Sequence, residues 1–481
     1  MPSDEHATLH GEDPSGPTDA PTHPLSRTAL LATGGLLGEF YDWLVFGFLA
    51  ATFATVFFST GSTLLSLLAF WSTFAVSMLV RPLGGAFFGW LGTRHGRRIA
   101  LLASVGLMSI PMFATAALPS YAAIGLAAPL LLVALRLIQG FSAGGEFSGS
   151  SVYLVEQARS DRRGTVASAG SLAAGAGSVL ASGVLTLLAL ALSEQQMTDW
   201  GWRIAYLIGG VVVLAVLLAR RRLPETRAFE AARDRGALPR EPLRAAIREE
   251  WRTMLLVGIL TGYGAVAFYF AIVFLPSYLH QVDAGFSRAT VLVLLVALSA
   301  TFAVLAPLFA ALADRFGRRP VMAVAVVALG ALVYPGLQLL GDGDVLGLWV
   351  GAFALVLPTT LFFGGYSAVG VELFSARNRQ AAFSITYNVG MAALGGTVGL
   401  IATALVAGIG ASLGPTVYVA ALSILTLAVL AMIPETARTP LGTAARARAE
   451  SVGGAINERK ALTLDTIAEP DTPTEPDGQA R

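Results

Sequence analysis

The sequence has no cysteine and a single lysine, Lys460, and charged residues of either sign are scarce in it. The absence of cysteine excludes disulfide bonds and thiolate metal sites. Only 13% of the residues are charged, whereas an ordinary soluble domain has about 25%. The five histidines lack metal-ligand spacing, and the net charge of +1 gives no indication of nucleic-acid binding. We therefore expect no metal site, no bound cofactor and no nucleic-acid partner.

Apolar residues make up 55% of the chain and lie in long blocks separated by short charged clusters. Such blocks are typical of membrane-spanning helices, since about 20 residues cross the hydrocarbon core of a bilayer. A backbone surrounded by lipid must satisfy its hydrogen bonds within the segment, so these blocks are expected to be helical. They predict twelve spans, at about residues 29–57, 64–91, 99–118, 128–156, 165–192, 203–219, 253–277, 289–312, 320–340, 345–372, 381–409 and 414–433.

Polar segments divide the chain. The first 26 residues are polar and acidic, without the basic start and short apolar core of a signal peptide. The last segment shows no sustained heptad, so no coiled coil is expected. The charged middle segment is interpreted as a solvated linker or as a regulatory, partner-docking element. The expected parts are a disordered cytoplasmic tail (1–28), a six-helix bundle (29–219), a cytoplasmic loop (220–252), a second six-helix bundle (253–433) and a cytoplasmic tail (434–481).

Arginines are distributed unequally between the two sides of the predicted membrane domain. The loops on one side contain 21 arginines, and those on the other contain only Arg203 and Arg288. Cytoplasmic loops carry the excess of basic residues in membrane proteins. This asymmetry predicts a multi-pass protein of the plasma membrane with both termini in the cytoplasm.

Short motifs recur between the two halves of the chain. The string TRHGRR at 93–98 returns as DRFGRR at 314–319, and Pro224-Glu225-Thr226 returns as Pro434-Glu435-Thr436. Each pair follows the same span of its half, so the halves share one orientation. Parallel repeats of this kind bind their substrate between the halves near the bilayer midplane. The sequence therefore predicts an all-α membrane protein of twelve transmembrane helices in two parallel six-helix repeats, working by alternating access.

Five ionisable residues fall inside the predicted spans of the first half: Glu39, Asp42, Arg81, Arg136 and Glu146. Such residues are costly in a membrane and are functional candidates by default. At about 1.5 Å per residue, Glu39, Arg81 and Glu146 reach similar depths. Three acids against two bases leave one acid unpaired, which favours proton coupling by Glu39, Asp42 and Glu146. Buried ion pairs that only fix the bundle are the structural alternative.

The second half has no charge at this depth but offers polar and aromatic residues instead. Aromatic residues on bundle helices serve packing more often than ligand contact. The two buried arginines are candidates for holding a substrate carboxylate. The full set of candidate substrate contacts is Arg81, Arg136, Gln139, Tyr269, Tyr366, Tyr387 and Asn388.

The loop that runs from Gly89 to Arg98 resembles the cytoplasmic signature of the major facilitator superfamily, Gly-x-x-x-Asp-Arg-x-Gly-Arg-Arg. This copy has Thr93 where the signature has Asp, and the second copy keeps Asp314 but has Ala310 where the signature has Gly. The resemblance implies that these loops latch the cytoplasmic side, with a weaker acid–arginine latch in the first half. It implies gate residues Gly89, Arg94, Gly96, Arg97, Asp314, Arg315, Gly317 and Arg318.

Longer strings resemble the metabolite:proton symporter family within this superfamily. They are Glu39-Phe-Tyr-Asp42, Arg81-Pro82-Leu-Gly-Gly, Gln139-Gly-Phe-Ser-Ala-Gly-Gly-Glu146, Trp200-Gly-Trp-Arg203 and Leu275-Pro-Ser-Tyr-Leu. The resemblance implies transport of organic acids or zwitterions together with protons, by a monomer. Osmosensing members have a C-terminal coiled coil, which this tail lacks.

These observations predict a proton-coupled symporter of a small organic solute, in the first place a carboxylate metabolite. An uncoupled uniporter or exchanger of the same fold is the main alternative. A drug efflux pump, whose mark is a wide aromatic cavity, and a non-transporting membrane sensor are further alternatives. No nucleophile–base pair, phosphate loop or metal spacing indicates an enzyme, and glycine-rich runs such as 140–149 indicate helix packing.

Overall fold

The computed structural model describes residues 23–58, 63–234, 242–375, 378–439 and 441, and within them helices joined by turns and short loops make up the chain. The first half consists of α1 (Arg27–Phe48), α2 (Ala50–Phe57), α3 (Thr63–Arg94), α4 (Arg97–Ala117), α5 (Tyr121–Ile124), α6 (Ala127–Ala143), α7 (Glu146–Gln157), α8 (Arg163–Ala167), α9 (Ala169–Ala191), α10 (Glu194–Gln196), the π-helical turn η1 (Met197–Gly201) and α11 (Trp202–Arg220).

After the short helix α12 (Arg227–Asp234) comes the second half. It consists of α13 (Pro242–Phe268), the π-helical turn η2 (Tyr269–Phe274), α14 (Leu275–Gln281), α15 (Arg288–Phe316), α16 (Arg318–Gly341), α17 (Val345–Glu372), α18 (Arg379–Gly390), the π-helical turn η3 (Met391–Gly395), α19 (Val398–Ile409) and α20 (Leu413–Met432).

Eleven helical stretches of the described chain are long and apolar enough to cross a bilayer. Helices α1 and α2, which meet at a bend of 68°, form a twelfth if the pair is counted as one span. This confirms the predicted fold class. Polar side chains set some helix starts: Ser26 accepts from Ala29 N at the start of α1, and Asp344 accepts from Gly347 N at the start of α17.

The middle of the chain differs from the sequence expectation at both of its edges. Arg220 still belongs to α11, and α13 begins at Pro242, ten residues before the predicted end of the central loop at 252. The apolar pattern placed these boundaries wrongly because arginines at helix ends look like loop residues. Of the predicted tails, 1–28 and 434–481, residues 1–22, 440 and 442–481 lie outside the described residues.

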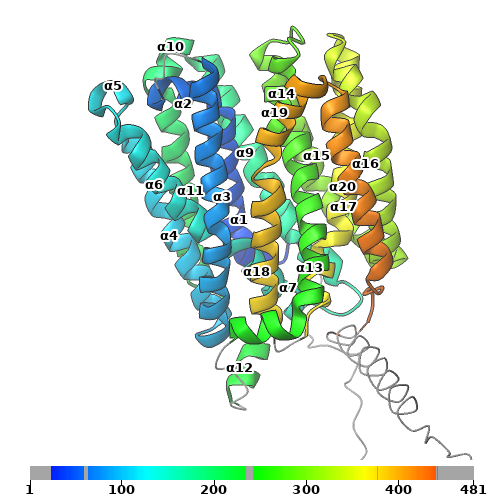
Figure 1. The fold of residues 1–481 in the computed structure, drawn as a ribbon. Helices are drawn as coiled ribbons and strands as arrows, with labels where there is room; N and C mark the ends of the chain where they lie inside the picture. The colour runs from blue at the N-terminus through cyan, green and yellow to red at the C-terminus, as the bar shows by residue number, and fades with distance from the viewer. Residues whose placement is uncertain (1–22, 59–62, 235–241, 376–377, 440, 442–481) are drawn as a thin grey trace, which may run out of the picture.

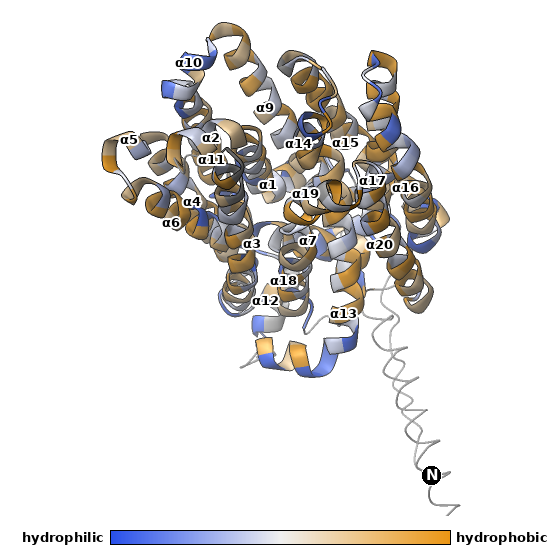
Figure 2. Cartoon of the chain, turned by 45° about the horizontal axis from the view of Figure 1, so that its top comes forward, coloured by the Kyte–Doolittle hydropathy of each residue, from blue (hydrophilic) through white to orange (hydrophobic). Residues whose placement is uncertain are grey.

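The two halves stand side by side in Figure 1, with α1–α11 on the left and α13–α20 on the right. They meet where α9 packs on α15 and where α3 packs on α18. The hydropathy view in Figure 2 shows apolar residues along the outside of nearly all long helices, and the start of α13 lies across the lower end.

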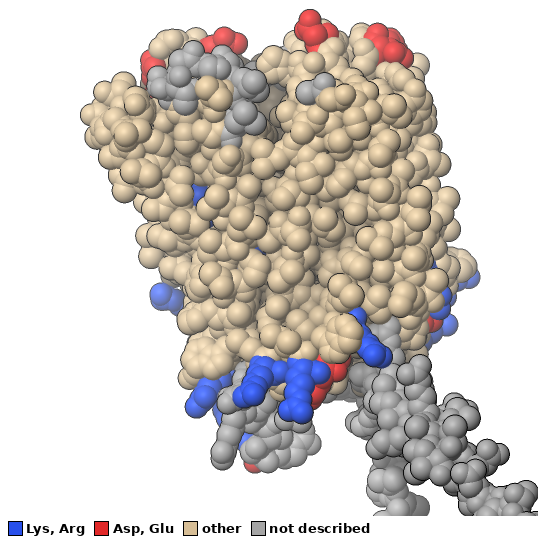
Figure 3. All heavy atoms as spheres, viewed as in Figure 1, with Lys and Arg blue, Asp and Glu red and all other residues tan. Residues whose placement is uncertain are grey.

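Charge separates the two ends of the molecule, as Figure 3 shows, with arginines gathered at the lower end and acids at the upper. We call the lower end the basic end. It carries the starts of α4, α8 and α16, where Arg97, Arg98, Arg163, Arg318 and Arg319 lie. We call the upper end the acidic end. It carries α10 and the turn between α16 and α17, where Glu194, Asp342 and Asp344 lie.

Glycines permit the close approach of α3 to α6, which positions the buried charges. A Cβ on Gly84 would collide with the backbone carbonyl of Phe141, and one on Gly140 would collide with that of Ser77. Small residues let membrane helices come into backbone contact. The glycine-rich run of the first half therefore serves helix packing.

Candidate substrate and proton site

Glu39 of α1 and Arg81 of α3 form a buried ion pair, with Arg81 Nη1 2.7 Å from Glu39 Oε1. Arg81 Nε also donates to Asn388 Oδ1 of α18 at 3.1 Å, and Nη2 donates to the carbonyl of Ala143 at 3.4 Å. The guanidinium lies over the ring of Trp43, 4.5 Å from its centroid. Arg81 thus contacts both halves of the molecule at once.

Asp42 and Arg136 form a second pair, one turn of α1 nearer the acidic end. Arg136 donates to both carboxylate oxygens, at 2.9 and 3.2 Å, and to the Tyr206 hydroxyl at 2.7 Å. Gln139 Nε2 adds a bond of 2.9 Å to Asp42 Oδ1. The guanidinium stacks on Phe46 at 3.9 Å from the ring centroid. This pair is enclosed by α1, α6 and α11, inside the first half.

Glu146, at the start of α7, pairs with Arg220 at 2.8 Å, and both side chains are fully buried. Ser104 also donates to the carboxylate. Arg220 donates in addition to the carbonyls of Leu31, Ala32 and Leu101. A sixth buried ionic residue therefore balances the three acids, and the predicted surplus of one acid is wrong. The sequence contained a signal for this residue, because Arg220 directly follows an apolar run, but Arg220 was counted as part of the central loop.

The depth expected for Glu146 is also corrected. A Cβ on Gly35 would collide with its carboxylate, which places this carboxylate one turn of α1 nearer the basic end than Glu39.

The three acids differ in how completely their oxygens are bonded. Both oxygens of Asp42 and both of Glu146 accept hydrogen bonds from their arginines. Glu39 Oε2 is buried and has no hydrogen-bond partner among the residues that the structure describes. A buried acceptor without a donor is unfavourable, and a proton on this oxygen would remove the negative charge that creates the problem. Glu39 is therefore distinguished from the other two acids by its geometry.

A small cavity of about 20 Å³ lies between the two halves beside this pair. It is lined by Phe40, Phe147, Ser171, Ala174, Thr261, Ala265, Phe268, Tyr269, Phe302, Phe363, Tyr366, Tyr387 and Met391. The Tyr366 and Thr261 hydroxyls bond at 2.6 Å, and the ring of Tyr387 stacks on that of Phe147 at 4.3 Å. The lining is thus mainly aromatic and contains no charged residue.

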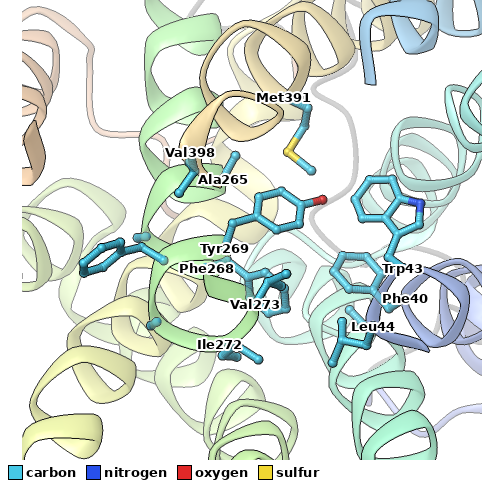
Figure 4. Packing of buried hydrophobic residues seen from close by; sticks show 14 of the residues in the cluster. Phe40, Trp43, Leu44, Ala265, Phe268, Tyr269, Ile272, Val273, Met391 and Val398 are labelled. Carbon is cyan, nitrogen blue, oxygen red and sulfur yellow. The ribbon is translucent and has the colours of Figure 1, made fainter. Parts of the chain in front are cut away.

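The hydroxyl of Tyr269 is buried and has no hydrogen-bond partner in the described part of the chain. Figure 4 shows it pointing into the space between Trp43 and Met391, that is, between the two halves. The rings of Trp43 and Tyr269 are 5.7 Å apart, and Trp43 in turn carries Arg81 on its face. An aromatic wall with one free hydroxyl thus meets the buried ion pair.

At the basic end, the second-half motif holds the halves together. Asp314 accepts from the backbone N–H groups of Gly164 and Thr165, at 3.0 and 2.8 Å, and from the Thr165 hydroxyl at 2.6 Å. Arg318 bonds to Asp314 at 2.6 Å and to Glu372 at 3.2 Å. Since Gly164 and Thr165 belong to the first half, Asp314 is an anion bound at the start of a helix of the opposite half.

The first-half copy of the motif makes a looser arrangement. Thr93 donates to the carbonyl of Gly89 in its own helix, so it does not take the role that Asp314 has. Glu156 is 3.9 Å from Arg97 and 3.6 Å from Arg379 of the other half. The latch predicted to be weaker thus has longer ion-pair distances.

Each of the two motifs is completed by one glutamate that lies outside the predicted gate. Glu225 accepts from the backbone N–H groups of Arg97 and Arg98, and Glu435 accepts from those of Arg318 and Arg319. The preceding glycines, Gly96 and Gly317, have φ of +115° and +104°, which side-chain-bearing residues rarely adopt. The repeated Pro-Glu-Thr strings could have identified these helix caps.

A family model described as Major Facilitator Superfamily matches residues 31–304, more than half of the chain. This chain belongs to the major facilitator superfamily. The proline/betaine transporter of Escherichia coli (strain K12) is 31% identical over 453 residues, covering 92% of this chain and 89% of that protein. The citrate-proton symporter of Klebsiella pneumoniae is 32% identical over 382 residues, covering 78% and 84%. These relatives confirm the resemblance to metabolite:proton symporters.

Among solved structures, that of the proton:xylose symporter XylE with bound 6-bromo-6-deoxy-D-glucose is similar at a TM-score of 0.70. It is 19% identical and the match covers 88% of this chain and 98% of that one. This agreement concerns the fold. Together with the relatives, it confirms that the chain is a membrane transporter of the major facilitator fold and that it is not an enzyme.

The structure separates the predicted contact residues of this major facilitator into three groups. Tyr269, Tyr366 and Tyr387 line the cavity, and Arg81 and Asn388 lie behind its wall. Arg136 and Gln139 instead bond Asp42 inside the first half, and their contact with the substrate stays a prediction. Phenylalanines of the cavity wall, Phe40 and Phe268 among them, were missed because buried apolar residues give no functional signal in a sequence.

The predicted gate residues also fall into two groups, those that make contacts between helices and those that are exposed. Asp314, Arg318 and Arg97 take part in the ionic contacts described above, and Gly89 faces Ser384 of α18 closely enough that a Cβ would be 3.3 Å from the serine Cβ. Arg94 and Arg315 are exposed instead. Arg315 lies over the ring of its neighbour Phe316. Motif membership alone therefore does not place a side chain in the gate.

Proposed function

We propose that this chain is a proton-coupled symporter of a small zwitterionic carboxylate, similar in class to proline or a betaine. The observation that carries the proposal is the meeting of a buried arginine–glutamate pair with an uncharged aromatic cavity between the halves. The names of the relatives, proline/betaine transporter and citrate-proton symporter, support this class of solute.

Arg81 is the proposed partner of the solute carboxylate. A guanidinium has five N–H donors, and the contacts described for Arg81 use three of them, one at 3.4 Å. Donors therefore remain for a carboxylate, which arginine can bind through two parallel hydrogen bonds. Arg136 is less suited, because Asp42, Tyr206 and Phe46 enclose it.

The aromatic wall is the proposed partner of an alkylated ammonium group. Cations are attracted to the faces of aromatic rings, and quaternary ammonium groups are recognised in this way. Phe40, Phe268 and Tyr269 stand on the cavity wall. An aromatic cavity was the expected mark of a drug efflux pump, but that expectation concerned a wide one. The cavity here is narrow, about 20 Å³, well below the volume of ligand pockets, so it must widen to admit even a small solute.

Glu39 is the proposed proton carrier, because among Glu39, Asp42 and Glu146 it is the acid with a buried carboxylate oxygen, Oε2, that has no donor in the described structure. Protonation would release Arg81 for the solute carboxylate, so proton and solute would bind together. Asp42 and Glu146 remain candidates from the sequence, but their arginines occupy both oxygens of each.

The ends of the molecule fit a transport cycle. Cytoplasmic loops are the basic ones, so we place the basic end in the cytoplasm. Arg163 lies 3.9 Å from Glu372, and Arg379 lies 3.6 Å from Glu156, each pair joining the two halves at that end. The conformation is therefore closed toward the cytoplasm, and these pairs must separate to release the solute there.

The test is proton entry into liposomes that contain the purified protein and a pH-sensitive dye. Proline, glycine betaine, citrate and 2-oxoglutarate are added one at a time without a membrane potential. We expect acidification of the lumen with a zwitterion and a smaller signal with the di- and tricarboxylates. Labelled solute that equilibrates without any acidification would contradict proton coupling and indicate a uniporter.

A further inference from the structure

Asn388 joins the two halves at the level of the buried Glu39–Arg81 pair. Its Oδ1 accepts from Arg81 Nε at 3.1 Å, across the contact between α3 and α18. Its Nδ2 donates to the carbonyl of Gly144 at 2.7 Å and to that of Ser384 at 2.8 Å. The side chain is fully buried, and its oxygen and its amide hydrogens are all engaged. Asn388 is not part of the cavity lining, so its bonds serve the interface.

Arg81 donates hydrogen bonds to two partners, and these two bonds differ in strength. It bonds the Glu39 carboxylate at 2.7 Å within the first half and the neutral Asn388 amide at 3.1 Å in the second. Both bonds are assisted by the charge of Arg81, but the bond to Glu39 also joins two opposite charges, whose attraction adds to it. The carboxylate therefore dominates while it is ionised, and the amide gains importance when the negative charge is removed.

The surroundings of Glu39 leave Arg81 as the group that can transmit this change. The other charged or titratable side chains facing Glu39 are Asp42 on its own helix, Glu146 of α7, Tyr269 of η2 and Tyr387 of α18. Arg81 is the cation in this set, and it alone in the set donates to the Glu39 carboxylate.

We propose that Asn388 is the positioning residue through which the second half responds to protonation of Glu39. Neutralised Glu39 releases Arg81 toward Asn388 and the solute carboxylate, and this changes how α18 is held against α3. The inference rests on the proposed function, since it requires Glu39 to carry the proton. It assigns Asn388 to coupling, whereas the sequence indicated substrate contact.

The place of Asn388 in α18 allows such a change to reach the cavity. Two residues later, at Gly390, α18 passes into the π-helical turn η3, and π-helical turns within helices often accompany functional sites. Tyr387 and Met391, on either side of Asn388, line the cavity. A shift of Asn388 therefore moves two residues of the cavity wall.

The close fit at this interface favours discrete arrangements over gradual sliding. A Cβ on Gly85 would collide with Asn388 Nδ2, so α3 and α18 touch directly at this point. One turn earlier, Ser384 donates to Ser148 of the first half at 3.0 Å. Ser384 thus crosses the same interface without contacting Arg81, which makes it a matched control.

The experiment compares Asn388→Ala, Asn388→Asp and Ser384→Ala in liposomes. Exchange of labelled solute reports folding and binding, whereas proton-driven accumulation and protons moved per solute report coupling. We expect Asn388→Ala to retain exchange while accumulation falls by about tenfold, the size expected for a hydrogen bond to a charged group. Asn388→Asp, which offers Arg81 a second carboxylate, should slow exchange and flatten its dependence on pH. Ser384→Ala should change neither the proton-driven accumulation nor the number of protons moved per solute.

The outcomes separate this inference from the proposed function. If Asn388→Ala keeps the wild-type number of protons per solute and the wild-type pH profile, Asn388 has no coupling role, while the symporter proposal stands. If the wild-type protein moves solute without protons, both proposals are wrong. Should Asn388→Ala fail to fold, an Asn388→Asp variant with unchanged exchange and pH profile would equally overturn the inference.

Discussion

The two halves of the molecule share one architecture but differ in what they bury. The first half encloses three ion pairs, Glu39–Arg81, Asp42–Arg136 and Glu146–Arg220. At the same depth, the second half has neutral contacts, such as the bond between Thr261 and Tyr366. The difference teaches that duplication preserved the helix packing and the caps at the basic end, while the chemistry of the core diverged.

The two copies of the gate motif at the basic end show the opposite asymmetry, because here the second half has the acid. The second-half motif keeps its acid, and Asp314 binds the start of α8 in the other half. The first-half motif has Thr93, whose hydroxyl turns back to its own helix. The buried ion pairs of the core thus lie in the first half, whereas the acid that binds backbone N–H groups of the opposite half lies in the second.

Replacing Arg220 should destabilise the first half strongly. Arg220→Met leaves the Glu146 carboxylate buried without its cation, and breaking a buried ion pair in this way costs about 3–5 kcal/mol. The measurement is the thermal unfolding of the purified protein. Arg221→Met, at the exposed next position, is the matched control. Removing both charges, in Glu146→Gln with Arg220→Met, should restore part of the stability. An unchanged unfolding midpoint in Arg220→Met would show that the Glu146–Arg220 pair does not stabilise the folded protein.

Weakening the gate in the second half should open the basic end. Asp314→Asn reduces the bonds to Gly164, Thr165 and Arg318 from charged to neutral ones, so the cytoplasmic side should open more often. The absence of native cysteine allows a single reporter, Ser148→Cys, which is buried between the halves. We expect its labelling by a maleimide from the basic end to accelerate about tenfold, the effect of roughly 1.4 kcal/mol. Arg315→Gln, at the exposed neighbour, should leave the rate unchanged.

Restoring the missing acid in the first half should have the opposite and smaller effect. Thr93→Asp places a carboxylate where the motif of the second half has one, near the start of α18. We expect the labelling of the same reporter to slow by about threefold, because the cost of burying a carboxylate at this buried position offsets much of the bond that it gains. Faster labelling would mean that the first-half motif cannot dock in this way and that its divergence goes deeper than one residue.

The sequence predicted much of the fold, because apolar blocks, arginine clusters and repeated motifs all depend on simple rules of membrane insertion. It also selected the buried charges of the first half. It could not assign partners, since depth along a helix does not fix the direction in which a side chain points. Glu39 and Asp42 lie on one face of α1, yet each binds a different arginine.

The remaining errors have equally specific causes. Arg220 was assigned to the central loop because a sequence alone does not distinguish an arginine at a helix end from an arginine in a loop. The cavity wall consists largely of phenylalanines, which a sequence offers everywhere in a membrane protein. Only the three-dimensional arrangement shows which of them face the space between the halves.

The central claim is that Glu39, and not the fully bonded Asp42 or Glu146, carries the coupled proton. The most direct measurement is the number of protons moved per solute by Glu39→Gln in liposomes, together with exchange of labelled solute. The account predicts that exchange continues and becomes independent of pH, while proton movement and accumulation against a gradient are lost. A Glu39→Gln protein that still moves protons with the solute at the wild-type ratio would contradict the account.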